Sequence, residues 1–295
     1  MMASSRGARD ETIDAGDDCI ESAGAIDAAA FDFLTPFVQR RQAGWNPASH
    51  WVYHVPEGTP DDPHCPWRRA NRPITDQTHI EAEERFMRSI LEEDGSDKAA
   101  AAERLLTRGV SVDSLVGLTR AHNLWDWQTY DVVQSLVKAA TEKSRCRFAD
   151  LPEVRPFTGT ATVFMSHTWS GRWGDLVAAA AAGARGSRIV WIDAFAVRQW
   201  PGNAADLNFR AVVEKCTAVI VAAPPTGGPD SSRIFRGYTY TSDHEAFLRD
   251  ERYEDGRKAV PFCRLWCIVE MDAAKQAGVP IIIKTAKVVP GASVP

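Results

Sequence analysis

The chain has 295 residues, a net charge of -5 and an apolar content of 44%. This length exceeds one typical domain, and the apolar fraction predicts a globular protein with one principal domain and a flanking region. The acidic balance excludes the basic surface typical of proteins that bind DNA or RNA, so nucleic acid is not an expected partner. The apolar runs are shorter than the roughly 20 residues of a membrane-spanning helix, so we expect no membrane span.

The N-terminus and the cysteines indicate a cytoplasmic protein. The first residues turn acidic at Asp10 and Glu11 and contain no apolar segment typical of a signal peptide. The cysteines lie at positions 19, 65, 146, 216, 263 and 267, unlike the dense framework of a small secreted fold. We therefore expect reduced thiols.

Two different regions are predicted in the first half of the chain. Residues 1–76 predict an irregular, partly disordered segment, because prolines recur between His50 and Pro73. His54, His64 and Cys65 lie there without the paired ligand doublets of a zinc site, so we expect no metal. Residues 77–150 predict a helical region, since apolar residues recur at spacings of three and four in residues 81–91, 98–107, 114–119 and 131–140. An aromatic cluster at residues 124–130 is interpreted as core or as an interface with the following domain.

The pattern changes after residue 157 to short, β-branched apolar runs, which are typical of strands buried on both faces. The predicted strands cover residues 161–166, 187–193, 217–222 and 279–284, and the predicted helices between them cover residues 173–183, 204–216 and 262–277. This alternation predicts an α/β domain over residues 158–290, with a doubly wound, flavodoxin-like parallel sheet of four to five strands preceded by the helical region.

Ligands of such sheets bind outside the carboxyl ends of the strands. Ser166, His167 and Trp169 follow the first predicted strand, and Asp193 follows the second. The third strand is followed by a long connection, residues 224–261, whose length is typical of a lid. We therefore expect a site built from these loops.

Glu270 lies in the third predicted helix, and its neighbours three and four positions away are mostly apolar. A carboxylate on an apolar stripe requires either a counter-ion or a function. Arg264 and Lys275 are the candidate counter-ions on this helix. Periodicity alone leaves both interpretations open.

Four segments of this half of the chain read, in order, FMSHTW, WIDAF, TAVIVAA and LWCIVEM. In order and spacing they resemble the Toll/interleukin-1 receptor (TIR) domain family, and the Trp266-Cys267-x-x-Glu270 pattern is the most specific of them. The combination of Ser-His-x-Trp and Trp-Ile-Asp is most similar to TIR-like algal and protist proteins. In enzymatic TIR domains the glutamate that matches Glu270 cleaves the nicotinamide–ribose bond of NAD+.

The resemblance implies an NAD+ glycohydrolase in which Glu270 is the catalytic carboxylate, NAD+ is the substrate and no prosthetic group is required. The residues expected to bind the nucleotide are Ser166, His167, Trp169, Trp173, Asp193, Phe195, Gln199 and Trp266. Many TIR enzymes carry an arginine soon after the first-strand serine, where this chain has His167 and Thr168, and Arg172 is the candidate substitute. The resemblance also implies a shortened version of the domain, since a full one adds a strand and two helices.

Non-catalytic TIR domains give the main alternative, a signalling module that self-associates through homotypic contacts. The sequence leaves open which of the two holds, and also the reaction product, the oligomeric state and the role of residues 1–150. A Ser166–His167 catalytic pair is disfavoured, because adjacent residues that leave a strand point in opposite directions. Rossmann and P-loop glycine motifs do not occur.

Overall fold

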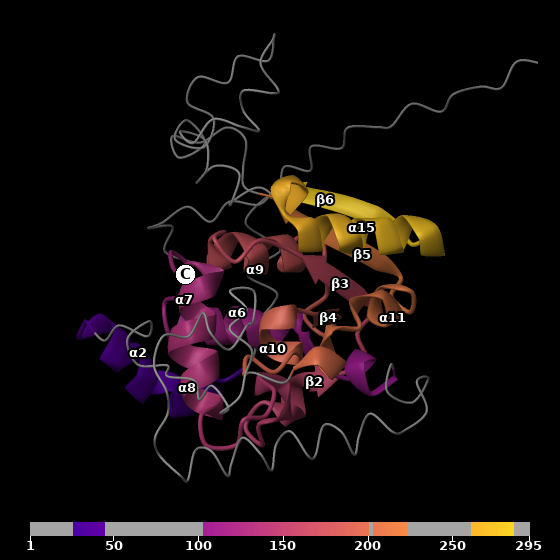
Figure 1. Cartoon of the computed structure of the whole chain (residues 1–295). Helices are drawn as coiled ribbons and strands as arrows, with labels where there is room; N and C mark the ends of the chain where they lie inside the picture. The colour runs from indigo at the N-terminus through magenta and orange to yellow at the C-terminus, as the bar shows by residue number, and fades with distance from the viewer. Residues whose placement is uncertain (1–25, 45–102, 201–202, 224–260, 286–295) are drawn as a thin grey trace, which may run out of the picture.

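The computed structural model describes residues 26–44, 103–200, 203–223 and 261–285 (Figure 1). Its centre is a six-stranded mixed sheet with the strand order β2-β1-β4-β3-β5-β6. The strands are β1 (Gly109–Ser111), β2 (Thr158–Gly159), β3 (Val163–Ser166), β4 (Ile189–Trp191), β5 (Ala218–Ala223) and β6 (Ile281–Thr285). Strands β3 to β6 are parallel to one another, and β1 runs antiparallel to β4 and β2.

The α/β fold and its four parallel strands are confirmed, but the prediction of four to five strands in a wholly parallel sheet is wrong. Two short antiparallel strands extend the sheet beyond β4, and β1 comes from the region predicted as helical. Both are too short for apolar periodicity to reveal. Gly109 allows the close approach of β1, because a Cβ at this position would lie 2.5 Å from Ile189 Cγ2.

Helices connect the parallel strands, as the sequence predicts. Helix α9 (Trp173–Ala181) follows β3, α10 (Asp193–Ala196) follows β4, and α15 (Leu265–Ala277) precedes β6. The predicted helix 204–216 is divided into the 3-10 turn η5 (Ala204–Leu207) and α11 (Phe209–Val213), and the 3-10 turn η7 (Pro261–Cys263) leads into α15. Helix α15 ends at Gly278, whose φ of 70° is the left-handed conformation that glycine adopts without strain.

The helical region is confirmed in part. Helix α6 (Val112–Ala121) covers the predicted segment 114–119, and α7 (Thr129–Val132), the π-helix η2 (Val133–Val137) and α8 (Lys138–Thr141) form one continuous segment over 131–140. Two short 3-10 turns, η3 (Phe148–Asp150) and η4 (Arg155–Phe157), lead to β2. The predicted helix 81–91 lies outside the described residues, as does the first half of 98–107, of which residues 103–106 are helical.

Residues 28–42 differ from the irregular structure predicted for the first 76 residues. They form the 3-10 helix η1 (Ala28–Leu34) and the helix α2 (Thr35–Gln42). Asp27 accepts a hydrogen bond from Ala29 N at 3.0 Å and so caps this segment. Phe31, Leu34 and Val38 are buried at spacings of three and four, and this packing stabilises two helices that are short.

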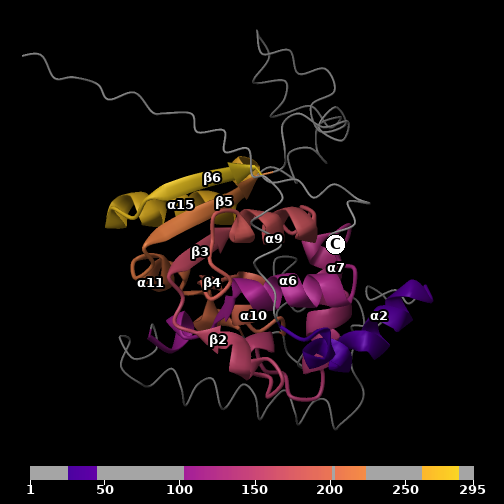
Figure 2. The same cartoon turned by 180° about the vertical axis from the view of Figure 1, so that it is seen from behind.

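The two faces of the sheet carry two apolar cores. Val163 and Met165 of β3 belong to the core that includes α6, α9 and η1, whereas Phe164 belongs to the core that includes α11 and α15. The alternation follows from the two-residue period of a strand. The helical region therefore shares one core with the parallel strands, and Figures 1 and 2 both place α2 on the opposite side of the molecule from α15.

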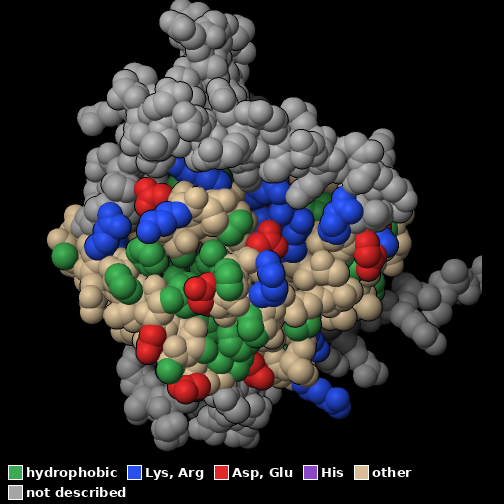
Figure 3. Space-filling model, turned by 90° about the horizontal axis from the view of Figure 1, so that it is seen from below, with side chains coloured by type: hydrophobic (Ala, Val, Ile, Leu, Met, Phe, Trp, Pro, Cys, Tyr) green, Lys and Arg blue, Asp and Glu red, His purple; other side chains and the backbone are tan. Residues whose placement is uncertain are grey.

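On the face shown in Figure 3, Lys and Arg side chains lie among Asp, Glu and apolar side chains. Among the residues that the structure describes, this face therefore has no large patch of purely positive or purely negative charge. Within the same residues, no helix combines the length and the apolar character that crossing a bilayer requires.

Candidate functional site

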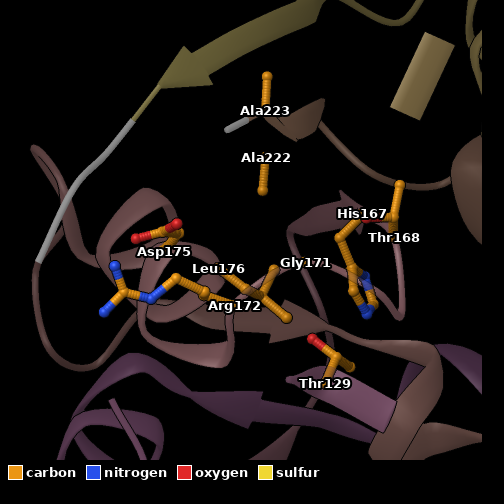
Figure 4. Close-up of a pocket in the computed structure, with 9 residues that line it drawn as sticks. All are labelled: Thr129, His167, Thr168, Gly171, Arg172, Asp175, Leu176, Ala222 and Ala223. Carbon is orange, nitrogen blue, oxygen red and sulfur yellow. The ribbon is translucent and has the colours of Figure 1, made fainter. Parts of the chain in front are cut away.

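The strand order reverses at β3. The chain runs from β3 to β4 on one side and then returns to β5 on the other side, so β3 and β5 are neighbours whose connections leave in opposite directions. This switch point is where open α/β sheets bind ligands. A cavity of about 30 Å³ lies there (Figure 4), and its lining consists of Thr129, His167, Thr168, Gly171, Arg172, Asp175, Leu176, Ala222 and Ala223.

The loop between β3 and α9 is fixed by the helical region. Thr129 N donates to Gly171 O at 2.9 Å, and Tyr130 N donates to Trp169 O at 2.8 Å. Gly174 lies so close to residue 125 that a Cβ would be 2.4 Å from Trp125 O. The aromatic segment 124–130 is therefore an interface with the α/β part of the chain, and its residue Thr129 enters the cavity lining.

Ser166 and His167 face opposite sides of the sheet. Side chains two residues apart on a strand lie on the same face, so Ser166 lies on the face of Phe164, which belongs to the core that includes α15. His167 lies on the face of Met165, which belongs to the core that includes α9. His167 accordingly lines the cavity next to α9. Ser166 is buried, and its hydroxyl is close enough to Glu270 to affect the pKa of that carboxyl group.

Glu270 is 7% exposed and lies on the inner face of α15 with Cys267, Ala273 and Ala274. Burial raises the pKa of the Glu270 carboxyl to about 8; the Ser166 hydroxyl opposes this shift, and the nearby Asp193 carboxylate adds to it. Both candidate counter-ions on the helix, Arg264 and Lys275, are exposed, and Glu270 forms no ion pair with any residue that the structure describes. Glu270 does not line the cavity itself.

Asp193 connects the two sides of the site. Its Oδ2 accepts a hydrogen bond from Trp169 Nε1 at 3.0 Å, and its Oδ1 lies 3.5 Å from His167 Nε2. The thiol of Cys267, one turn before Glu270, donates to the His167 carbonyl at 3.3 Å. Asp193, His167 and α15 are thereby brought together at the carboxyl ends of β3 and β4.

Four buried polar atoms of this cluster have no hydrogen-bond partner within the described ranges: Ser166 Oγ, His167 Nε2, Asp193 Oδ1 and Glu270 Oε2. Buried polar groups in native proteins are usually paired, because an unpaired group costs about 1–3 kcal/mol. These atoms lie near one another, His167 Nε2 3.5 Å from Asp193 Oδ1 and Ser166 beside Glu270, so the cluster is a place where a ligand or bound water can add the hydrogen bonds that its own members do not complete. We name these four residues the polar cluster.

Trp173 and Phe195, predicted as nucleotide-binding residues, lie in the apolar core rather than at this site. Trp173 is fully buried and donates from Nε1 to Thr119 Oγ1 at 2.8 Å. Phe195 packs on Phe148 and Trp173, with ring centroids 4.6 and 5.4 Å apart. Both rings follow strands whose ends form the site, but they point into the core, where their apolar area is buried.

Gln199 and Trp266 also differ from the prediction. The Gln199 amide donates to the carbonyls of Asp193, Ala194 and Val197 at 3.0–3.3 Å, so it stabilises its own loop. Trp266 is 53% exposed and contacts the edge of Phe209, with centroids 5.8 Å apart. It lies in the first turn of α15, outside the inner face that holds Glu270.

The predicted lid, residues 224–261, lies outside the described residues except for its last one. Thr129, Asp175 and Leu176 were not identified from the sequence as lining residues. Thr129 lies about 40 residues before Gly171, and backbone hydrogen bonds bring the two together, so no side-chain pattern marks the contact. Arg172, the candidate phosphate ligand, lines the cavity and pairs with Asp126.

No protein-family model matches the chain, and neither a curated protein nor a solved structure matches it. The chemistry of the site is therefore the basis for a function. Its components are a buried carboxyl group of raised pKa, a second carboxylate, an imidazole and a hydroxyl. Such a set can bind a polar ligand and stabilise a developing positive charge.

Proposed function

We propose that the chain is a TIR-like protein with a doubly wound, flavodoxin-like domain that hydrolyses NAD+ to ADP-ribose and nicotinamide, with Glu270 as the catalytic carboxylate. The observation that carries this proposal is the burial of Glu270 without a counter-ion beside Ser166 and Asp193. A structural carboxylate at such a depth is usually paired, since an unpaired buried charge is costly.

A single carboxylate suffices for this reaction. The C1′–N1 bond of the ribose breaks, its electron pair returns to the pyridinium nitrogen, and nicotinamide leaves as a neutral molecule without a general acid. The ribose becomes an oxocarbenium-like cation, which a carboxylate in a water-poor site stabilises strongly. Water then adds to C1′, and its proton is released to solvent. Burial on the inner face of α15 places the Glu270 carboxylate in such a low-dielectric environment.

The raised pKa of Glu270 gives the proposed reaction a characteristic pH dependence. With a pKa of about 8, the carboxyl group is mostly protonated at pH 7 in the free protein. The anionic form is the one that stabilises the transition state. We therefore expect kcat/KM to rise with pH up to about 8 and then to level off.

Release of nicotinamide from NAD+ by the purified protein tests the proposal directly, beside the isosteric variant Glu270→Gln. The wild type should release nicotinamide, and the variant should lose activity by a factor of at least about 100, because it lacks the charge while keeping the shape. Asp272→Asn is the matched control, since Asp272 lies on the exposed side of the same helix. Equal release by wild type and Glu270→Gln, or no release by either folded protein, would refute a hydrolase centred on Glu270.

Self-association is a second candidate function, and the outer face of α15 favours it. Leu265, Ile268 and Val269 are exposed at helical spacing, and Leu265 is 73% exposed. Contiguous exposed apolar side chains are typical of interaction surfaces. A Leu265→Ser variant should weaken concentration-dependent self-association in sedimentation velocity runs, and Lys275→Ser, at an exposed position of the same helix, should not. Wild type that stays monomeric at high concentration would exclude this function.

A further inference from the structure

The hydroxyl of Thr129 is a buried polar group at the cavity that the proposed mechanism does not use. Thr129 is 0% exposed, and its Oγ1 has no hydrogen-bond partner among the described residues. Figure 4 shows this oxygen turned toward the other lining residues. Since an unpaired buried hydroxyl is costly, its position at a cavity indicates that a ligand group supplies the missing bond.

His167 is the second such group. It is 9% exposed, it lines the same cavity, and its Nε2, which lies 3.5 Å from Asp193 Oδ1, completes no hydrogen bond in the described part of the chain. A hydroxyl and an imidazole can each donate or accept a hydrogen bond. The two groups come from different regions, Thr129 from the start of α7 and His167 from the end of β3.

The size and charge of the cavity indicate what it binds. Its volume of about 30 Å³ holds about two water-sized groups. The only charged side chains in its described lining are Arg172 and Asp175, which carry opposite charges, and Arg172 also pairs with Asp126. A phosphate would therefore find little net positive charge, whereas two neutral hydroxyls match both the volume and the two unpaired groups.

We propose that Thr129 and His167 bind the vicinal hydroxyls of a ribose, Thr129 the 2-hydroxyl and His167 the 3-hydroxyl, with the remainder of the nucleotide outside the cavity. This inference rests on the proposed function, because it names a ribose of the NAD+ substrate as the group that the cavity accepts. Glu270 does not line the cavity, so this is the ribose away from the bond that breaks. It also makes Thr129, a residue of the helical region, part of the ligand site. Leu176 and Ala222 form the aliphatic wall against which the sugar ring packs.

The test compares two sugars that differ by one hydroxyl, ribose 5-phosphate and 2-deoxyribose 5-phosphate, in calorimetric titrations at millimolar concentration. Wild type should bind ribose 5-phosphate about tenfold more tightly, roughly the effect of one hydrogen bond. Thr129→Val, which keeps the shape, should erase this preference, and Thr129→Ser should retain most of it. Ser135→Ala is the matched control, because Ser135 is another buried hydroxyl without a described partner but does not line the cavity.

Equal affinity of wild type for the two sugars, no binding of either, or an unchanged preference in Thr129→Val would overturn the inference. The sugars carry no nicotinamide, so the two proposals fail separately. A ribose preference without nicotinamide release from NAD+ would remove the hydrolase and leave the ribose site. Nicotinamide release without a ribose preference would do the reverse.

Discussion

The segment after β4 contains Asp193 of the polar cluster and, further along, Asp206, which is surrounded by a second grouping of buried polar side chains. The two groupings differ in whether their polar atoms are hydrogen-bonded. Around Asp206, which is 1% exposed, the charges are paired: both carboxylate oxygens accept from Arg147 Nε at 3.1 Å, and Oδ2 also accepts from Arg198 N at 3.0 Å. In the polar cluster, by contrast, four buried atoms complete no hydrogen bond among the described residues, and the nearest charged contact, between His167 Nε2 and Asp193 Oδ1, is 3.5 Å long. Paired groups rigidify a fold, whereas unpaired groups cost stability that a ligand can recover.

The charges around Asp206 are held by segments far apart in the chain. Arg108 precedes β1, Arg147 follows α8 and Arg198 follows α10, and all three guanidinium groups lie within 4 Å of the Asp206 carboxylate. Burial and the neighbouring Arg147 lower the pKa of Arg108 to about 10, so it stays charged at neutral pH. The loop that begins with Asp193 is thereby anchored only a few residues after the polar cluster.

The largest expected effect comes from removing the shared charge of the paired grouping. Asp206→Asn should destabilise the protein by about 3–5 kcal/mol, because it leaves buried guanidinium groups without their carboxylate. Thermal unfolding should then occur about 10 °C lower than in wild type.

The control for Asp206→Asn is Glu214→Gln, which breaks an exposed pair with Arg210 at 2.8 Å. An exposed pair of this kind is worth less than about 1 kcal/mol, so this variant should unfold close to the wild-type temperature. Equal unfolding temperatures for Asp206→Asn and Glu214→Gln would contradict the distinction between a structural and a functional grouping.

The sequence predicts the parallel strands and the burial of Glu270 for simple physical reasons. Strands β3 to β6 are continuous apolar runs, and all four begin and end within two residues of their predicted bounds. Burial on both faces accounts for the runs of β3 to β5, whereas the isoleucines of β6 are exposed. Glu270 lies inward because Cys267, Ala273 and Ala274 are three and four positions away on one helix.

The remaining features of the site depend on contacts that periodicity does not encode. An aromatic residue after a strand can face a pocket or the core. Trp173 and Phe195 face the core, where Trp173 donates a hydrogen bond to Thr119 and the ring of Phe195 packs on Phe148. Thr129 reaches the cavity through backbone hydrogen bonds to the loop after β3, which any residue could make. Strand β1 is specified by pairing with β4 rather than by its own three residues.

The unpaired grouping should respond to charge removal in the opposite direction. The folded protein holds the Glu270 proton up to a pKa of about 8, whereas the unfolded chain releases it near the ordinary value for glutamate, about 4.3. Between these values the folded state binds more protons than the unfolded state. Burial of Glu270 therefore makes the stability of wild type fall as the pH rises from about 4.3 to about 8, and the loss is complete above that range.

Glu270→Gln removes this loss, because the amide has the same shape and carries no proton to release. At pH 9 the variant should unfold several degrees above wild type, up to about 10 °C, and near pH 4 the two should unfold together. Asp272→Asn, on the exposed side of α15, should show no such divergence. A Glu270→Gln variant less stable than wild type at pH 9 would mean that the Glu270 carboxylate has a stabilising partner, and the contrast with Asp206 would then disappear.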